Sequence, residues 1–236
     1  MIMKIIMMVV AALMVTVSAN AQFEKGTWSL QPYFGGVVSS VTNVDPFDIG
    51  SGGLLKKKMT VGIIFGGEAE YQISNRFSAA VGLNYTTQGC AWEDYDYWDG
   101  PIRVKVKNQC DNLGYIKIPV VANYYIAKGL AVKAGVQFGF MVNSEFYASG
   151  EAKMDVFEDG VMRDVNLYGT VNMKDTYNKF DFSIPVGLSY QVKQIPITID
   201  ARYQIGLTKL NKESIPGVKD SKNSVFTLTV GYKFAL

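Results

Sequence analysis

The sequence predicts an all-β protein, an eight-stranded antiparallel up-and-down transmembrane β-barrel with short periplasmic turns and long extracellular loops. Three observations support this fold class. Segment after segment alternates apolar and polar residues with the period of two that is typical of a β-strand. The connections between these segments are alternately long and short. The first residues have the features of an export signal.

The N-terminal stretch, MIMKIIMMVVAALMVTVSANA (residues 1–21), predicts a cleaved signal peptide. Lys4 precedes an apolar core, and Ala19-Asn20-Ala21 has the small-x-small pattern of a signal peptidase site. A retained transmembrane anchor is the alternative, but the apolar run is short for a hydrocarbon core of about 30 Å. No basic stop-transfer cluster follows it. We therefore expect a mature domain of residues 22–236 that resides in the cell outer membrane.

The composition excludes several classes of function. Lys and Arg number 23 against 21 Asp and Glu, so the chain has no basic field for nucleic acid. The chain contains no histidine, which removes His-based nucleophile activation and His metal ligation. We therefore expect no catalytic residue, no metal site and no cofactor.

Eight segments alternate strongly enough to be predicted as strands. The connections after the second, fourth and sixth segments are a few residues long, whereas those after the others run from about a dozen to more than thirty. In an up-and-down barrel, odd and even connections lie at opposite ends, so one end has tight turns and the other has long loops. The predicted strands cover residues 27–36, 58–71, 77–88, 113–126, 130–142, 180–192, 197–210 and 226–236.

The polar face of these strands separates a membrane barrel from a soluble one. It is rich in Gly, Ala, Ser and Thr, whose side chains are too small to cover the exterior of a soluble barrel. The opposite face carries no charge in the middle of any strand, as contact with lipid requires. An eight-stranded barrel has an interior that side chains fill. The inward charges balance, so we predict a paired plug rather than a charged conduction path. They are Glu68, Glu70, Lys117, Lys133, Asp181, Asp200, Arg202 and Lys233.

The last residues, FTLTVGYKFAL, alternate up to the final leucine. A closed barrel must pair its last strand with its first, because a bilayer offers no water to an open edge. The pattern also resembles the C-terminal insertion signal that the barrel-assembly machinery recognises, although Leu stands where an aromatic residue is usual. Its residues are Thr229, Gly231, Phe234 and Leu236.

Three stretches carry a family resemblance: YIKIPVVANYY, DFSIPVGLSYQV and DARYQIGLTKL. They are similar to the PorT-like outer-membrane β-barrel family of Bacteroidota, a group of porin-like small barrels. The resemblance covers most of the mature chain and implies no activity. The family's name-giving member is similar to accessory parts of a secretion system. Because mid-strand proline marks a break in a sheet, we expect Pro119 and Pro185 at local interruptions of the ladder.

The second long loop contains the candidate contact residues. Cys90 and Cys110 lie at its two bases, and we expect them to form a disulfide. Between them, an aromatic cluster could bind an extracellular protein or glycan, or could pack within the loop. The acidic residues of this loop match no EF-hand spacing, so we interpret them as a solvated tip. The aromatic residues are Trp92, Tyr95, Tyr97 and Trp98.

The third long loop, residues 144–178, alternates around an Asp-Gly turn signal, so we expect its strands to extend the barrel wall beyond the membrane. The favoured function is therefore non-enzymatic action through the extracellular loops, as an adhesin, as an envelope component or as an accessory to a secretion or transport system. Expected partners are outer-membrane lipid, the barrel-assembly machinery and an extracellular protein or glycan. A narrow porin-like channel for small solutes is the alternative, and an outer-membrane enzyme is the least favoured.

Overall fold

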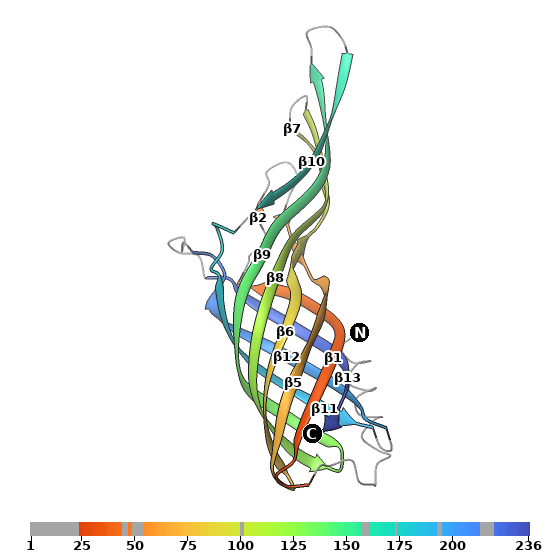
Figure 1. Cartoon of the computed structure of the whole chain (residues 1–236). Coiled ribbons are helices and arrows are strands. Elements are labelled where there is room, and N and C mark those ends of the chain that lie inside the picture. The colour runs from red at the N-terminus through yellow and green to blue at the C-terminus, as the bar shows by residue number, and fades with distance from the viewer. Residues whose placement is uncertain are drawn as a thin grey trace.

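The structure is a computed structural model that describes residues 24–43, 47–48, 54–99, 102–156, 161–172, 174–192, 195–212 and 220–236. The predicted signal peptide, residues 1–21, lies outside these ranges. The described chain is a β-structure whose main strands form a closed ring (Figure 1). Within the described residues there is no helix that is long and apolar enough to span a membrane.

Eight antiparallel strands close the ring in sequence order, as the alternation predicted. The last of these, β13, pairs with β1, for example Phe34 with Val230, and closes the barrel. Short β14 (Phe234–Ala235) continues β13 along the same edge of β1. The ring consists of β1 (Trp28–Thr42), β5 (Thr60–Ser74), β6 (Phe77–Trp92), β8 (Ile102–Ala127), β9 (Leu130–Val156), β11 (Phe180–Gln191), β12 (Ile197–Lys209) and β13 (Lys222–Tyr232).

The two ends of the barrel differ as predicted. Two-residue turns join β5 to β6 and β8 to β9 at one end. At the other end the connections contain additional strands, and the paired β8 and β9 continue far beyond the ring (Figure 1). These additional strands are β2 (Phe47–Asp48), β3 (Leu54–Leu55), β4 (Lys57–Lys58), β7 (Tyr95–Asp99) and β10 (Val161–Asn172). The strands of the third long loop therefore extend the barrel wall, as expected, and those of the second long loop do so as well.

The two mid-strand prolines interrupt the ladder on one side each. Pairing of β6 with β8 passes from Val81–Val120 to Asn84–Lys117 without partners at Pro119. Pairing of β9 with β11 passes from Gln137–Ser183 to Ala134–Val186 without a partner at Pro185. Proline has no N–H to donate, so its strand loses a bond on that side. The predicted local breaks are confirmed.

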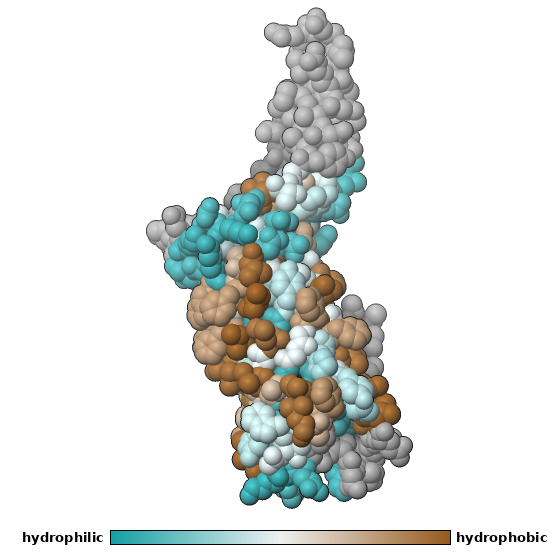
Figure 2. Space-filling model, in the orientation of Figure 1, coloured by the Kyte–Doolittle hydropathy of each residue, from teal (hydrophilic) through white to brown (hydrophobic). Residues whose placement is uncertain are grey.

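The outward face of the ring is apolar over its middle, and teal polar residues flank the brown zone in Figure 2. Large apolar side chains alternate with buried polar ones along each strand. On β9, for example, Val136, Phe138 and Phe140 are exposed while Gln137 is buried. At the short-turn end, exposed aromatic residues of neighbouring strands lie in register, such as Trp28 with Tyr71 and Phe77 with Tyr124. This is the surface that a hydrocarbon layer with aromatic interfaces requires.

Candidate functional site

The interior of the barrel holds all eight charges that the alternation assigned to it. Each is at most 7% exposed. They come from strands on all sides of the ring, so their contacts cross the lumen rather than follow one strand. The buried charges are Glu68, Glu70, Lys117, Lys133, Asp181, Asp200, Arg202 and Lys233.

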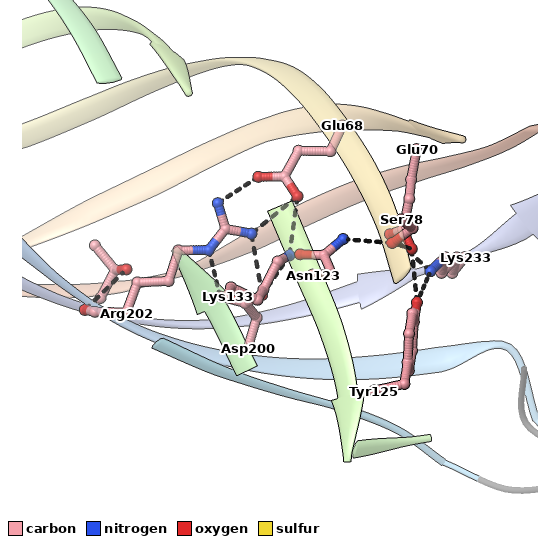
Figure 3. Close-up of polar contacts among 10 residues, drawn as sticks. Glu68, Glu70, Ser78, Asn123, Tyr125, Lys133, Asp200, Arg202 and Lys233 are labelled. Carbon is pink, nitrogen blue, oxygen red and sulfur yellow. Dashed lines mark hydrogen bonds and ion pairs between the residues drawn. The ribbon is translucent and has the colours of Figure 1, made fainter. Parts of the chain in front are cut away.

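The first group in the lumen is a four-residue ion-pair cluster centred on Arg202 (Figure 3). The Arg202 Nε donates to Asp200 Oδ1 at 2.6 Å, and its Nη2 donates to Glu68 Oε2 at 2.9 Å, while Nη1 contacts Glu68 Oε1. The Lys133 ammonium lies 2.8 Å from Asp200 Oδ2 and 3.1 Å from Glu68 Oε2. Asp200 and Arg202 are two residues apart on one strand, so they share its inward face. The cluster pairs two acids with two bases, and each carboxylate contacts both cations.

A second group lies nearer the short-turn end and is centred on Glu70 (Figure 3). Lys233 Nζ lies 2.8 Å from Glu70 Oε2, while the hydroxyls of Tyr125 and Ser78 each donate to Glu70 Oε1 at 2.6 Å. Asn123 in turn donates to Ser78 Oγ at 3.0 Å. The sequence-based list lacks Ser78, Asn123 and Tyr125. The period of two places Ser78 and Asn123 on the inward polar face, and Tyr125, which alternates with the exposed Tyr124 and Ile126, follows from the same pattern.

Lys117 and Asp181 differ from the other buried charges because their hydrogen bonds are to neutral groups. Lys117 Nζ donates to Gln88 Oε1 at 2.6 Å and to Gln204 Oε1 at 2.7 Å. Asp181 Oδ1 accepts from Asn223 Nδ2 at 2.9 Å. The interior is therefore a network of amides and ion pairs, rather than a plug built from charge pairs alone.

Towards the long-loop end of the lumen, a layer of apolar side chains lies over this network. We call this layer the cap; it consists of Val41, Cys90, Leu113, Tyr115, Met141, Tyr177 and Leu210. Tyr177 belongs to the segment between β10 and β11. Its neighbour Asn178 fixes this segment by donating from its backbone N–H to Leu210 O at 2.7 Å and from its side chain to Lys209 O at 2.9 Å. The strand pattern gave no indication that this segment packs into the mouth.

One carboxyl is embedded in the cap. Asp111 accepts hydrogen bonds from the Tyr177 hydroxyl at 3.0 Å and from the Cys90 thiol at 3.5 Å. Burial raises the pKa of Asp111 above its ordinary value, although the hydrogen bonds from Tyr177, Cys90 and Trp92 oppose that effect. Burial, reinforced by the nearby Asp111, also raises the pKa of Cys90 and of Tyr177. All three groups are thus held towards their protonated forms.

The two cysteines are free in the structure, so the expected disulfide is not formed. Cys90 is directly opposite Asp111, whereas Cys110 is opposite Ala91. Because neighbouring residues of a strand face opposite sides of the sheet, the two thiols point in opposite directions. Cys90 is part of the cap, and Cys110 Sγ lies 3.6 Å from Thr60 Oγ1. The sequence-based expectation considered the proximity of the strands but not their register.

The aromatic residues of the second loop do not form a single described cluster. Trp92 is half-buried and packs against the cap. Tyr95 is half-buried in β7. Tyr97 and Trp98 lie in the same strand, but their side chains are outside the described part of the structure. Whether these residues form a contact surface stays a prediction.

The C-terminal residues complete the ring. Thr229 is buried opposite Gly35, Gly231 pairs with Tyr33, and Phe234 pairs with Leu30. The Leu236 side chain is exposed, and its backbone N–H donates to Trp28 O at 2.9 Å. These contacts stabilise the closure of the ring. Recognition of this segment by the barrel-assembly machinery stays a prediction.

Within the described ranges, no group of three or more Cys, Asp or Glu side chains has an arrangement that could hold a metal ion. The sequence of residues 20–212 matches a family model described as an outer membrane protein β-barrel domain. The chain belongs to this family. The match covers most of the ring, and it establishes the barrel as one of the outer membrane. It does not distinguish PorT-like proteins from other members.

Comparison with solved structures gives matches to small outer-membrane barrels. Ail, the attachment invasion locus protein of Yersinia pestis, is 15% identical, with 89% of this chain and 99% of that chain covered at a TM-score of 0.42. Neisserial surface protein A is 17% identical, with 88% and 97% covered at 0.40. OprG from Pseudomonas aeruginosa is 13% identical, with 92% and 99% covered at 0.40. A comparison with curated protein sequences gives no significant match. At these values the similarities carry no inference about function.

Proposed function

We propose that this protein is a closed barrel that anchors an extracellular β-sheet in the outer membrane and acts through that sheet without catalysing a reaction. The observation that carries this proposal is the occupied lumen. Two hydrogen-bonded groups, one around Arg202 and one around Glu70, cross it, and the cap lies at its long-loop end. The additional β-structure of the long loops lies outside the lumen, in β7, β10 and the upper parts of β8 and β9.

Adhesion, a structural role in the envelope and assistance to a secretion or transport system all fit this architecture. An extracellular protein or glycan is the proposed partner. We also propose that residues 1–21 direct export and that the C-terminal segment is read by the barrel-assembly machinery. We propose no enzymatic activity, because the chain lacks the histidine that acid-base and nucleophilic mechanisms most often use.

A narrow porin-like channel is the second candidate, and one observation favours it. Several buried lumen atoms have no hydrogen-bond partner within the described residues, including Gln31 Nε2, Thr86 Oγ1, Gln88 Nε2 and Thr198 Oγ1. Buried polar groups of this kind are commonly satisfied by internal water. A hydrated lumen would conduct only if water also passed the cap and the ion-pair cluster.

Conductance across a planar bilayer distinguishes the two candidates. The purified protein should show no steady conductance above that of the bare bilayer. A variant that weakens the cap, Tyr177→Ala, provides the matched comparison, because it leaves the lumen charges intact. Steady single-channel conductance of the unmodified protein would overturn the closed-barrel proposal and favour the channel.

The orientation is tested separately by labelling intact cells. In a Cys90→Ser, Cys110→Ser background, a cysteine replaces either exposed Lys107 above the barrel or exposed Arg76 in the β5–β6 turn. A membrane-impermeant maleimide should label Lys107→Cys and leave Arg76→Cys unlabelled until the cells are opened. The reverse labelling pattern would place the extended sheet in the periplasm.

A further inference from the structure

The outward face of β12 and β13 changes from apolar side chains to lysines at the long-loop end. On β12, Leu207 is 40% exposed, and Lys209 occupies the next outward position. The neighbours Leu210 and Ser221 are buried at 6% and 8% exposure, on the inward side. Because successive residues of a strand face opposite sides, Lys209 and Lys222 point away from the lumen. They therefore stand directly above the apolar surface of these two strands.

Lys209 and Lys222 are also direct partners across the two antiparallel strands. Like charges directly opposite each other in a sheet are destabilising. An anion that contacts both ammonium groups would remove this repulsion. Lys209 has an interaction within the protein as well, so the net charge of the surrounding surface decides whether an anion is attracted.

The surrounding surface is positive because two connecting segments meet here. The Asn178 side chain donates to Lys209 O at 2.9 Å, and the Lys212 N–H donates to Thr176 O at 3.1 Å. Within the described residues 174–179, 209–212 and 220–222, five lysines stand against two aspartates, which leaves a net charge of +3. We call the four lysines nearest these contacts the lysine rim; they are Lys179, Lys209, Lys212 and Lys222.

Apolar side chains continue directly below the lysine rim. Phe180, next to Lys179, is 44% exposed, and Ile205 and Leu207 are 43% and 40% exposed. Polar residues border the brown apolar zone at this end of the barrel (Figure 2). A molecule on this surface would meet hydrocarbon-facing side chains below and ammonium groups above. Its chemistry is that of an amphiphile with acyl chains and an anionic headgroup.

The short-turn end of the barrel has a different border. There, exposed aromatic residues face outward, and the rings of Trp28 and Tyr71 lie 5.0 Å apart. Aromatic rings suit any membrane interface, since they combine an apolar body with a polar edge. Lysines select for negative charge, because anionic lipid headgroups attract them. The two ends therefore differ in the headgroup charge that they favour.

We propose that the lysine rim binds the phosphate groups of a phosphorylated lipid whose acyl chains lie against the apolar face of β11, β12 and β13. Flexible lysine stems lie along apolar surface while their ammonium groups reach the headgroup. Each ammonium supplies a charged donor to a phosphate oxygen. The site is formed by the ring and its connecting segments, and it does not depend on whether the lumen conducts. Its placement in the outer leaflet rests on the proposed orientation of the barrel.

Binding of lipid A to the full-length protein tests the site. Native mass spectrometry of the protein in detergent micelles counts the bound lipid molecules over a titration. Lipid A should bind at lower concentration than the same lipid after enzymatic removal of its phosphates. Equal binding of the two forms would overturn the proposal, because the phosphate would then make no contribution.

Removal of charge from the lysine rim tests which residues hold the lipid. Lys209→Gln combined with Lys222→Gln should weaken lipid A binding about 30-fold, from the usual contribution of a lysine to anionic-lipid binding. The matched control is Lys25→Gln combined with Arg76→Gln, which removes two exposed cations at the short-turn end. The control should bind lipid A within about twofold of the unmodified protein. Equal losses from the two pairs would overturn the assignment to the lysine rim.

Two further measurements keep this result unambiguous. Heat-modifiable gel migration of each variant should remain that of a folded barrel, and the single variants Lys179→Gln and Lys212→Gln replace any double variant that fails this check. Inorganic phosphate, added at the concentration of the lipid phosphate, should not displace lipid A. Displacement would identify a site for free phosphate and refute a lipid site. Because binding is measured in detergent, its failure is separate from a failure of the proposed orientation, which the labelling of intact cells tests.

Discussion

The lower and upper halves of β8 have opposite polarity patterns. Within the ring, Lys117 is 1% exposed and its neighbour Ile116 is 40% exposed. In the sheet that β8 and β9 form with β7 and β10 above the ring, which we call the extension, Val106 is 9% exposed and its neighbour Lys107 is exposed. One continuous strand therefore buries its charge in the first region and its apolar side chain in the second. The solvent accounts for the difference, because hydrocarbon surrounds the ring and water surrounds the extension.

The change of polarity along β8 marks the passage from the lipid-facing ring to the water-facing extension. A change of environment along a strand requires the pattern to shift, and β8 has register shifts between Lys107 and Cys110 and between Gly114 and Tyr115. Bulges of this kind alter which face a side chain occupies. The cap and Asp111 lie at this boundary. The same strand pair can therefore serve as a lipid-embedded wall and as a water-exposed sheet.

The largest expected effect comes from breaking the buried cluster of the ring. Arg202→Ala removes the contacts of Arg202 with Glu68 and Asp200 and leaves these two carboxylates to Lys133 alone. Loss of one partner from a buried ion pair costs about 3–5 kcal/mol. Urea unfolding from lipid vesicles, followed by gel migration without boiling, measures the change. An Arg202→Ala protein as stable as the unmodified one would mean that the ion pairs of Arg202 make no net contribution to stability.

The second-largest effect concerns exposed valines, one facing lipid and one facing water. Val120 is 43% exposed on the ring and Val171 is 54% exposed on β10, so both valines reach the surroundings. Val120→Lys should cost about 2–4 kcal/mol, as a lysine facing the bilayer core does. Val171→Lys should change stability by less than about 1 kcal/mol. The same unfolding assay applies to both. Equal losses of stability would show that the apolar outward face of the ring does not face lipid.

A smaller effect concerns Asp111 at the boundary, and it depends on pH. Because the folded-state pKa of Asp111 is raised, ionisation of this carboxyl opposes folding. Its penalty is absent below the unfolded pKa and grows as pH rises towards the folded pKa. Asp111→Asn should therefore be more stable than the unmodified protein at neutral pH, and the difference should shrink as pH falls. Thermal unfolding at several pH values measures the stability difference between the two proteins. A difference that grows as the pH falls would contradict a raised folded-state pKa of Asp111.

The smallest effect belongs to a charge of the extension. Lys107 is exposed, so Lys107→Ala should leave the free energy of unfolding within about 0.5 kcal/mol of the unmodified value. It is the matched control for Arg202→Ala, because both remove one cation from the chain. A large loss would indicate that the Lys107 side chain supports the sheet.

The sequence by itself determined the local features of this protein. A period of two assigns every residue of a strand to one face, so the eight strands, their order and the inward position of the eight charges follow from the pattern. The short and long connections then predict the two ends of the barrel. These inferences use only the order of the residues along the chain.

Only the tertiary structure decided which inward residues meet. Glu68 and Arg202 are 134 positions apart, and their contact depends on closure of the ring and on the stagger of its strands. The same holds for the Tyr177 segment over the mouth and for the opposite faces of Cys90 and Cys110, since a shift of one residue in register reverses a side chain's face. Periodicity is a property of one strand, whereas register and closure are properties of many strands together, so no single segment could reveal them.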